Sequence, residues 1–499
     1  MNIKAFSALA LGLVLTGSAF AQKLQDLPEY NIPQSQTTKH MNILAADEML
    51  GRKPGQPGNL MAGRYIAEQF RALGLKPANG DSYFQKVALE TVIPPQEGTL
   101  TTTEGSAKIG SDFVLMHGSG LKGEYETVHL PYAWVDKEKG YDDYKGVDVK
   151  GKVIITSVGV SDADAPNQLF ASIEDKQKLA KERGAVAIIE VFNSPRPWNM
   201  VVRYFGRPST KMKTAESEGD EITHLWISST SAKILVANKI SKVNLEIGAR
   251  RTVEVPTYNV GGILEGSDPK LKEEYLVLSA HYDHVGHGAG AGNVSAGDTI
   301  FNGARDNAFG TVAVLTAAEA FTKVKPKRSI LFLAYTAEEM GLLGSRYYAE
   351  HPLIPLNKTV FNMNCDGAGY NDITRITVIG LDRTGVKEEF NTATAAFGLT
   401  AQDDPAPEQN LFDRSDNVSL AAKGIPAPTY SPGFNAFDAA INKYYHQAAD
   451  NPDNIDHAYL LKYAQSYTYA ARLIANRAKA PEWISGDKYE QAFKKLYNR

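Results

Sequence analysis

The stretch YLVLSAHYD, residues 275–283, decides the fold. Its first six residues form an apolar run that predicts a buried strand. This strand runs directly into His281, and Asp283 follows two residues later. A histidine at a strand end can bind a metal while a nearby acid holds its free ring nitrogen, although a surface or structural role is the better explanation of an isolated His-x-Asp.

Apolar strands alternate with helices on both sides of this stretch. The predicted elements are strands 275–280, 329–335 and 359–363, and helices 310–321 and 342–351. This alternation predicts an α/β fold with a mixed, mostly parallel central sheet flanked by helices. Ligands in such folds collect beyond the carboxyl ends of the strands, so chemistry is expected there.

The rest of the chain divides into regions with different sequence patterns. Residues 22–93 are expected to form the N-terminal part of the main domain, with helical periodicity in 37–75 interrupted by a loop at 51–55. Residues 94–255 contain short β-branched runs and predict an inserted β-rich domain, whereas 256–499 carry the α/β pattern.

Composition excludes several classes of protein. The 499 residues are 43% hydrophobic with a net charge of −4, which is typical of globular domains and speaks against a disordered chain or a nucleic-acid partner. The only cysteine, Cys365, excludes an intrachain disulfide and is expected to be a small buried residue.

The N-terminus predicts export. Lys4 precedes an apolar run from Ala5 to Ala19, and Ala19-Phe20-Ala21 matches a small-x-small cleavage site. Residues 1–21 are therefore interpreted as a signal peptide, giving an exported periplasmic or secreted protein without a membrane anchor after cleavage. The run is shorter than the roughly 20 residues that span a bilayer.

Further acids and a histidine follow other predicted elements. Asp306 precedes a helix, Glu338 and Glu339 follow strand 329–335, Asp366 follows strand 359–363, and His446 lies far downstream. Each has a simpler explanation alone, such as a capping acid or an acidic helix start. Together with His281 they supply enough nitrogen and oxygen ligands for two divalent ions, and a spare glutamate suits hydrolysis.

The order of these motifs resembles the dinuclear zinc aminopeptidase family, which includes glutamate carboxypeptidase and the transferrin receptor. The resemblance extends to the 51–55 loop and, through segments at 150–153 and 184–185, to the protease-associated domain of secreted members. It implies the zinc exopeptidase fold, two Zn²⁺ ions per chain and peptide substrates.

The resemblance also implies a ligand set. Asp306 bridges both ions, with His281 and Asp366 completing one site and Glu339 and His446 the other.

The remaining roles follow in the same way. Glu338 is the general base and acid, Asp283 supports His281, and Tyr445 matches a tyrosine that stabilises the oxyanion in some members. The neighbouring Tyr444 is the alternative to Tyr445. His284 and His287 fall in a glycine-rich stretch and receive no role.

Three positions depart from the family pattern: Arg305 replaces a common acid, Phe309 a small residue, and Asn417 a frequent histidine. None is an implied ligand, so they bear on substrate preference. The sequence favours a secreted exopeptidase that removes N-terminal residues. It leaves open carboxypeptidase or glutaminyl cyclase chemistry and a receptor-like binding protein, although the intact ligands speak against the last. The oligomeric state stays open.

Overall fold

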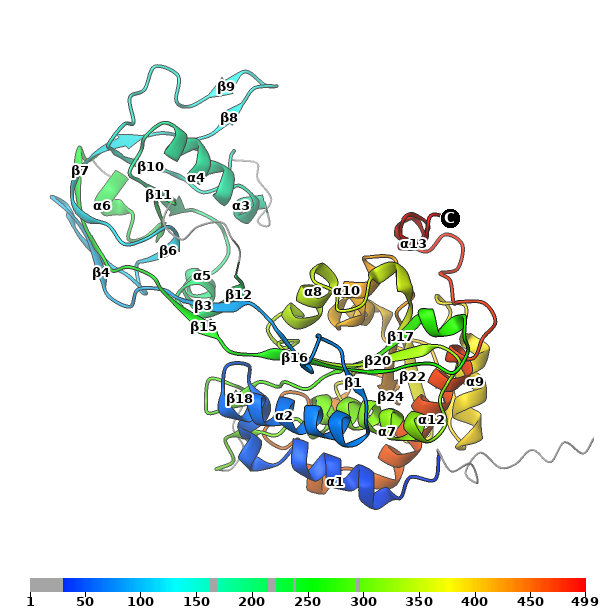
Figure 1. Ribbon diagram of the computed structural model, residues 1–499. Coiled ribbons are helices and arrows are strands. Elements are labelled where there is room, and N and C mark those ends of the chain that lie inside the picture. The colour runs from blue at the N-terminus through cyan, green and yellow to red at the C-terminus, as the bar shows by residue number, and fades with distance from the viewer. Residues whose placement is uncertain (1–29, 162–167, 214–220, 237–238, 293–296) are drawn as a thin grey trace, which may run out of the picture. The chain divides into compact units, whose positions relative to one another are not determined.

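The computed structural model describes residues 30–499 except 162–167, 214–220, 237–238 and 293–296. The predicted signal segment, residues 1–21, lies outside the described residues. The chain divides into two compact units, unit 1 (Met1–Lys86 and Thr257–Arg499) and unit 2 (Val87–Pro256), which Figure 1 shows. Unit 2 includes the whole range 94–255 that the sequence assigns to an insert.

Unit 1 is built on one mixed sheet. Its strands are β1 (Lys76–Pro77), β2 (Phe84–Lys86), β16 (Tyr258–Leu264), β17 (Tyr275–His281), β20 (Ser329–Tyr335), β21 (Thr359–Cys365), β22 (Arg375–Ile379), β23 (Thr400–Gln402) and β24 (Thr429–Pro432). The order is β1-β16-β20-β17-β21-β24-β22-β23, and β2 pairs with β16. The central strands β20, β17, β21 and β24 run parallel, whereas β16 and β22 join them antiparallel. The parallel arrangement predicted from the sequence therefore describes the centre of a sheet whose flanks are antiparallel.

Helices cover both faces of this sheet. They are α1 (Gln34–Leu44), α2 (Pro57–Ala72), α7 (Phe309–Lys323), α8 (Leu343–Glu350), α9 (Lys387–Ala396), α10 (Asn417–Ala421), α11 (Ala439–Asn442), α12 (His457–Ala475) and α13 (Glu490–Tyr497). In Figure 1, α2, α7 and α12 lie on one face and α8 and α10 on the other. The central strands are accordingly buried along their whole length, as in β20 and β21.

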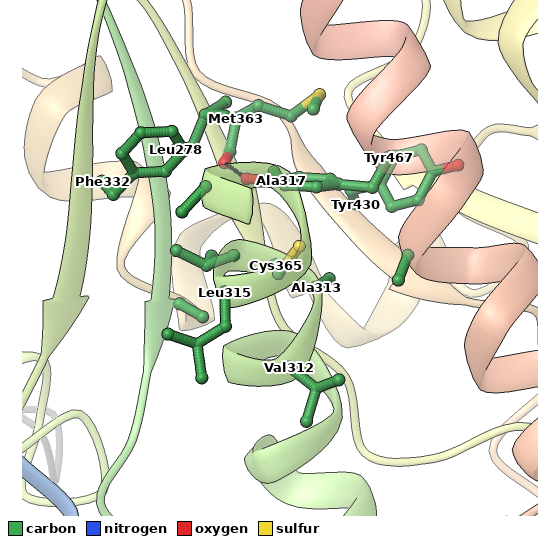
Figure 2. Packing of buried hydrophobic residues seen from close by; sticks show 14 of the residues in the cluster. Leu278, Val312, Ala313, Leu315, Ala317, Phe332, Met363, Cys365, Tyr430 and Tyr467 are labelled. Carbon is green, nitrogen blue, oxygen red and sulfur yellow. Dashed lines mark hydrogen bonds between the residues drawn. The ribbon is translucent and has the colours of Figure 1, made fainter. Parts of the chain in front are cut away.

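The main core lies between the sheet and helix α7. Figure 2 shows Leu315 and Ala317 of α7 on the side of the helix toward Leu278 of β17 and Phe332 of β20, and all four belong to one buried cluster. Helix α7 is buried on nearly every side, because α12 covers its outer face. This packing fixes the start of α7, which follows Asp306, relative to the ends of the strands.

Cys365 lies fully buried in the same core, as expected, beside Tyr430 and Tyr467 (Figure 2). The hydroxyl of Tyr467 donates a hydrogen bond of 2.8 Å to the carbonyl of Met363 in β21. Burial raises the pKa of the Cys365 thiol well above its usual value, so the group is an inert thiol.

Several predicted elements start or end elsewhere. Helix α8 begins at Leu343 rather than Leu342, because Leu342 adopts a left-handed conformation with φ of 63°. Strand β21 continues to Cys365, two residues past its predicted end, because it pairs with both β17 and β24. The region 37–75 forms α1 and α2 separated by the short helical turn Asp47–Arg52.

Unit 2 is rich in β structure. Its strands are β3 (Leu89–Ile93), β4 (Gly98–Thr102), β5 (Gly105–Lys108), β6 (Phe113–His117), β7 (Lys122–His129), β8 (Val135–Asp136), β9 (Tyr141–Asp142), β10 (Val153–Ser157), β11 (Ala187–Phe192), β12 (Ser209–Met212), β13 (Thr223–Ser228), β14 (Lys242–Ile247) and β15 (Arg251–Val255). The helices are α3 (Gln168–Ala171), α4 (Ile173–Glu182), α5 (Trp198–Phe205) and α6 (Lys233–Val236). The larger sheet has the order β5-β4-β14-β7-β10-β11-β13-β6, and β3 lies between β12 and β15 in a smaller one.

Across the described residues, no helix combines the length and the apolar character that crossing a membrane requires.

Candidate functional site

The predicted ligands come together at the carboxyl ends of the central parallel strands. His281 is the last residue of β17, Glu338 and Glu339 follow β20, and Asp366 follows β21. Asp306 lies in the helical turn Ala304–Ala308 that leads into α7. Because parallel strands end at the same edge of the sheet, residues far apart in sequence meet here.

Two groups of potential ligands share Asp306. His281, Asp306 and Asp366 form the first group, and His284, Asp306, Glu339 and His446 form the second; in each, one ligand atom per residue lies within 4.8 Å of the others.

In the first group, His281 Nε2 lies 3.1 Å from Asp366 Oδ1 and 3.4 Å from Asp306 Oδ1. In the second, His446 Nε2 lies 3.2 Å from Asp306 Oδ2 and 3.1 Å from Glu339 Oε2. The two carboxylate oxygens of Asp306 therefore face different groups, which is the arrangement that a bridging ligand requires.

These distances fit metal coordination. Around a tetrahedral zinc ion with bonds of about 2.0–2.1 Å, two ligand atoms lie roughly 3.3–3.4 Å apart. Each histidine Nε2 also faces two carboxylate oxygens, although a neutral ring nitrogen can donate only one hydrogen bond. Nitrogen and oxygen donors together suit Zn²⁺, and the same donors accept Co²⁺ or Mn²⁺.

The electrostatics of the site point the same way. Within the described residues, no lysine or arginine forms an ion pair with Asp283, Asp306, Glu339 or Asp366. Burial lowers the pKa of His446, but the carboxylates of Asp306 and Glu339 outweigh it and raise the pKa to about 10. The cluster thus carries an excess of negative charge that a divalent cation would neutralise.

His284 belongs to the site although the sequence analysis assigned it no role. Its side chain is buried, and Nδ1 lies 2.7 Å from Glu339 Oε1 and 4.0 Å from Asp306 Oδ2. Glu339 is therefore held from both sides, by His284 at one oxygen and His446 at the other. The signal available in the sequence was the position of His284 three residues after His281. His287, by contrast, is exposed.

Asp283 touches both His281 and the two glutamates. The carbonyl oxygen of Asp283 lies 3.2 Å from His281 Nδ1, and its carboxylate Oδ1 lies 3.7 Å from the same nitrogen. The backbone amides of Glu338 and Glu339 donate to this carboxylate over 3.1 and 3.4 Å. Asp283 thereby fixes the segment after β20, where Ala337 takes a left-handed conformation with φ of 57°.

Glu338 lines the cavity beside the two ligand groups. Burial and the charges of Asp366 and Glu339 raise the pKa of Glu338 well above its usual value, although His281 acts in the opposite direction. A carboxyl with a raised pKa is suited to proton transfer near neutral pH.

The structure separates the two neighbouring tyrosines. Tyr445 lines the same cavity, and its ring lies 4.1 Å from that of His446. Tyr444 instead stacks on the guanidinium of Arg305 at 3.7 Å and lines a different surface pocket. Burial raises the pKa of Tyr445 well above its usual value, so its hydroxyl stays protonated and can donate a hydrogen bond.

Two buried arginines hold the loops around the site. Arg52, from the predicted 51–55 loop, donates to the carbonyls of Tyr282 and Asn302 over 2.6 Å each and to that of Gly303 over 2.9 Å. Arg305 pairs with the buried Asp450 over 2.9 Å. The two side chains support the loops that carry His281 and Asp306.

The other two departures from the family pattern are also structural. Phe309 packs in the core with its ring 5.0 Å from that of Tyr463. Asn417 is buried and donates to the carbonyl of Ala427 over 3.2 Å. Neither residue lines the cavity, so the structure gives no support to a role of Phe309 or Asn417 in substrate preference.

The rest of the cavity is lined by apolar side chains together with Arg414 and the hydroxyl side chains of Ser415, Thr429 and Ser431. Its free volume is about 80 Å³, and its walls beyond the ligands include Ile379, Leu411, Phe434, Phe437 and Ile441. Ser415 also lines it and donates to Asp366 Oδ2 over 2.5 Å, leaving Oδ1 of that carboxylate for the first ligand group.

Comparison with known proteins places this site in a family. Aminopeptidase YwaD of Bacillus subtilis is 24% identical over 398 residues, which cover 78% of this chain and 75% of that protein. A probable leucine aminopeptidase 2 of Aspergillus oryzae is 25% identical over 65% of this chain and 66% of its own. The structure of an aminopeptidase from Aneurinibacillus sp. strain AM-1 superposes with a TM-score of 0.52 at 20% identity, covering 91% of this chain and 95% of that one, which supports the fold.

Residues 259–471 match Peptidase family M28, and this range contains both ligand groups and Glu338. The sequence-based expectation is confirmed at this level: this segment of the chain is similar to Peptidase family M28.

Proposed function

We propose that the protein is a zinc-dependent aminopeptidase that hydrolyses peptides at their N-terminal residue. The observation that carries the proposal is the pair of ligand groups that share Asp306, with Glu338 beside them in a small cavity. The relatives named as aminopeptidases support the choice of the N-terminal end of the peptide.

Two ions would be held by the residues that the sequence implies. His281 and Asp366 would complete one site and His446 and Glu339 the other, with Asp306 common to both. His284 would orient Glu339 through its 2.7 Å contact. Bound zinc supplies a water of lowered pKa and polarises the scissile carbonyl.

Glu338 would handle the proton. Its carboxylate would accept the proton from the attacking water and return it to the leaving amine, which is the role of a general base and then acid. The contacts of Asp283 with the amides of Glu338 and Glu339 would keep both side chains in place during this transfer. The hydroxyl of Tyr445 would donate a hydrogen bond to the oxygen that becomes negative at the carbonyl carbon.

The cavity suggests the class of substrate. A volume of about 80 Å³ accommodates one side chain, and the apolar walls would bind an apolar one. We therefore expect peptides that begin with residues such as leucine, isoleucine or phenylalanine to be hydrolysed faster than peptides that begin with a charged residue.

A panel of peptides tests the proposal. The zinc-loaded protein should hydrolyse Leu-Ala-Ala and leave both acetyl-Leu-Ala-Ala and a peptide with C-terminal glutamate and a blocked N-terminus intact. Release of the C-terminal glutamate, or cyclisation of an N-terminal glutamine without hydrolysis, would refute the aminopeptidase proposal in favour of the alternatives left open by the sequence. A Glu338→Gln protein, purified in parallel, serves as the control for contaminating peptidases.

Export and the identity of unit 2 complete the proposal. The protein would be exported and begin at Gln22 after cleavage. Unit 2 would correspond to the protease-associated domain of secreted members. An intact mass that includes residues 1–21 in protein recovered outside the native cell would contradict the cleavage.

A further inference from the structure

Unit 2 has a pocket of its own, and none of the residues that line it belongs to the candidate metal centre. It lies beside α5 and has a volume of about 770 Å³. The rings of Phe170 and Phe205 form its apolar floor, stacked 6.1 Å apart with an angle of 18°. Trp226 is fully buried behind them, with its ring 5.3 Å from Phe170 and 6.1 Å from Phe205.

Exposed apolar side chains form the rim of this pocket. Met200 is 55% exposed and Tyr204 is 76% exposed, although both belong to residue types that helices usually bury. Exposed apolar groups next to a concave surface are typical of binding sites.

The charged residues of the pocket are all positive. Arg196, Arg203 and Arg207 line it and are exposed, and none of the described residues that line it is acidic. Within the described part of the chain, none of these guanidinium groups has a hydrogen bond or ion pair. Other cations of unit 2 do have such partners, for example Lys242, whose Nζ lies 2.7 Å from Glu124.

The three arginines come from α5 and from the residues on either side of it. Met200 and Arg203 lie three residues apart within the helix, a spacing that brings their side chains to the same face. Arg196 precedes the helix and Arg207 follows it, and both line the same pocket. Three positive groups thus surround an apolar floor on a protein whose net charge is −4.

We propose that this pocket binds acidic peptide segments in which carboxylates alternate with apolar side chains. An arginine fork matches a carboxylate with two hydrogen bonds, and an apolar side chain would cover the rings of Phe170 and Phe205. The concave shape favours a peptide over a lipid bilayer, which a flat or convex face would contact. The proposal goes beyond the proposed function, because this binding needs neither the metal ligands nor Glu338.

Fluorescence anisotropy of the full-length protein tests the proposal. The probe is a labelled peptide of alternating glutamate with leucine and phenylalanine, acetylated and amidated so that it offers no free N-terminus. We expect the triple variant Arg196→Gln/Arg203→Gln/Arg207→Gln to weaken binding by about tenfold or more, from about 0.5 kcal/mol for each exposed charge pair. The same peptide with glutamine in place of glutamate should bind about as weakly.

A matched control removes the same charge elsewhere in unit 2. Lys122→Gln/Lys137→Gln/Lys178→Gln changes three exposed lysines outside the pocket and should change binding less than twofold. Tyr204→Ala removes an exposed rim side chain and should weaken binding while leaving every arginine in place. If the triple arginine variant does not fold, the single charge reversal Arg203→Glu takes its place. It should weaken binding of the acidic peptide at least as much as Tyr204→Ala does.

Several results would overturn the proposal. An equal loss of affinity in the two triple variants would mean that only the net charge of the protein matters. Equal binding of the glutamate and glutamine peptides would mean that the pocket does not recognise carboxylates. Tighter binding of oligothymidylate or of phosphatidylglycerol vesicles through the same arginines would assign the pocket to a nucleic acid or a lipid surface. Failure of the peptidase assay leaves this result unaffected, because the probe is not a substrate for N-terminal hydrolysis.

Discussion

Two buried clusters of histidine and carboxylate differ in what neutralises them. In unit 2, Glu190 lies between Lys176 and His224, with contacts of 2.7 and 2.5 Å, and all three side chains are buried. Burial raises the pKa of Glu190, but Lys176 and His224 outweigh it and lower the pKa. Burial also lowers the pKa of His224, which favours the neutral ring. The charges of Lys176 and Glu190 therefore balance within the protein.

In the part of unit 1 that the structure describes, no lysine or arginine forms an ion pair with the carboxylates of the candidate metal centre. Three carboxylates, those of Asp306, Glu339 and Asp366, face His281 and His446, and the pKa values of these two histidines move upward instead. For His281, burial lowers the pKa, but Asp366 and Glu338 are among the groups that raise it well above its usual value. The comparison shows that the charges of the Glu190 cluster are neutralised by side chains of the protein itself. The carboxylates of the site in unit 1 need positive charge from outside, as protons or as metal ions.

The largest effect is expected from Asp306→Asn, which removes the carboxylate shared by both ligand groups. We expect loss of both ions and of all measurable hydrolysis, because neither group keeps its full set of ligands. Elemental analysis and peptide turnover provide the measurement, with Glu190→Gln as the control that keeps its metal. A folded Asp306→Asn protein that still holds two tightly bound ions would show that the clusters do not share this residue.

Glu338→Gln should separate catalysis from metal binding within the same cluster. The variant keeps the shape of the side chain and every ligand, so two ions should remain while kcat falls by about 10²- to 10⁴-fold through loss of the proton carrier. Glu339→Gln should instead lower metal content and kcat together. Near-normal kcat in a fully loaded Glu338→Gln protein would place the base elsewhere.

In the cluster of Glu190, Lys176 and His224, Glu190→Gln should destabilise the protein by about 3–5 kcal/mol, because Lys176 would stay buried without its counter-charge. Urea unfolding followed by tryptophan fluorescence gives the measurement, and three of the four tryptophans lie in unit 2. Lys176→Met combined with Glu190→Leu should recover much of this loss, since no charge is then left unpaired. A negligible change in the free energy of unfolding of Glu190→Gln would show that Lys176 does not depend on Glu190 for neutralisation.

Another buried histidine, His40, has no carboxylate partner among the described residues. His40 Nδ1 lies 2.6 Å from the hydroxyl of Tyr65, and burial together with Lys39 lowers the pKa of His40 to about 4. The unfolded chain therefore binds a proton below pH 6.5 that the folded protein does not. The contribution of His40 is present above this pH and is lost as the pH falls toward 4, by up to about 3 kcal/mol.

The measurement is the unfolding free energy of the wild type minus that of His40→Gln at several pH values. This difference should shrink as the pH falls from 6.5 to 4, since glutamine does not titrate. A difference that stays constant over this range would show that His40 is protonated in the folded protein or exposed to solvent.

The fold was predictable where periodicity is strong. Strand β20 occupies the predicted range 329–335. Its unbroken apolar run is typical of a strand that a sheet buries on both faces. The antiparallel flanks were not predictable, because β16 and β22 are short apolar runs whose direction depends on which strand they pair with. The ends of α8 and β21 likewise depend on local backbone conformation and on pairing rather than on residue type.

The sequence by itself determined the candidate ligand types, since His281, Asp306, Glu339, Asp366 and His446 stand in an order that a strand-end site explains. Only the tertiary structure decided that His284 joins them. It also decided that Asp283 binds the amides of the two glutamates and that Tyr445 rather than Tyr444 lines the cavity. The physical reason is that residue type fixes which atoms can donate or accept. Their distances and the charges around them depend on strands and loops that come together only on folding.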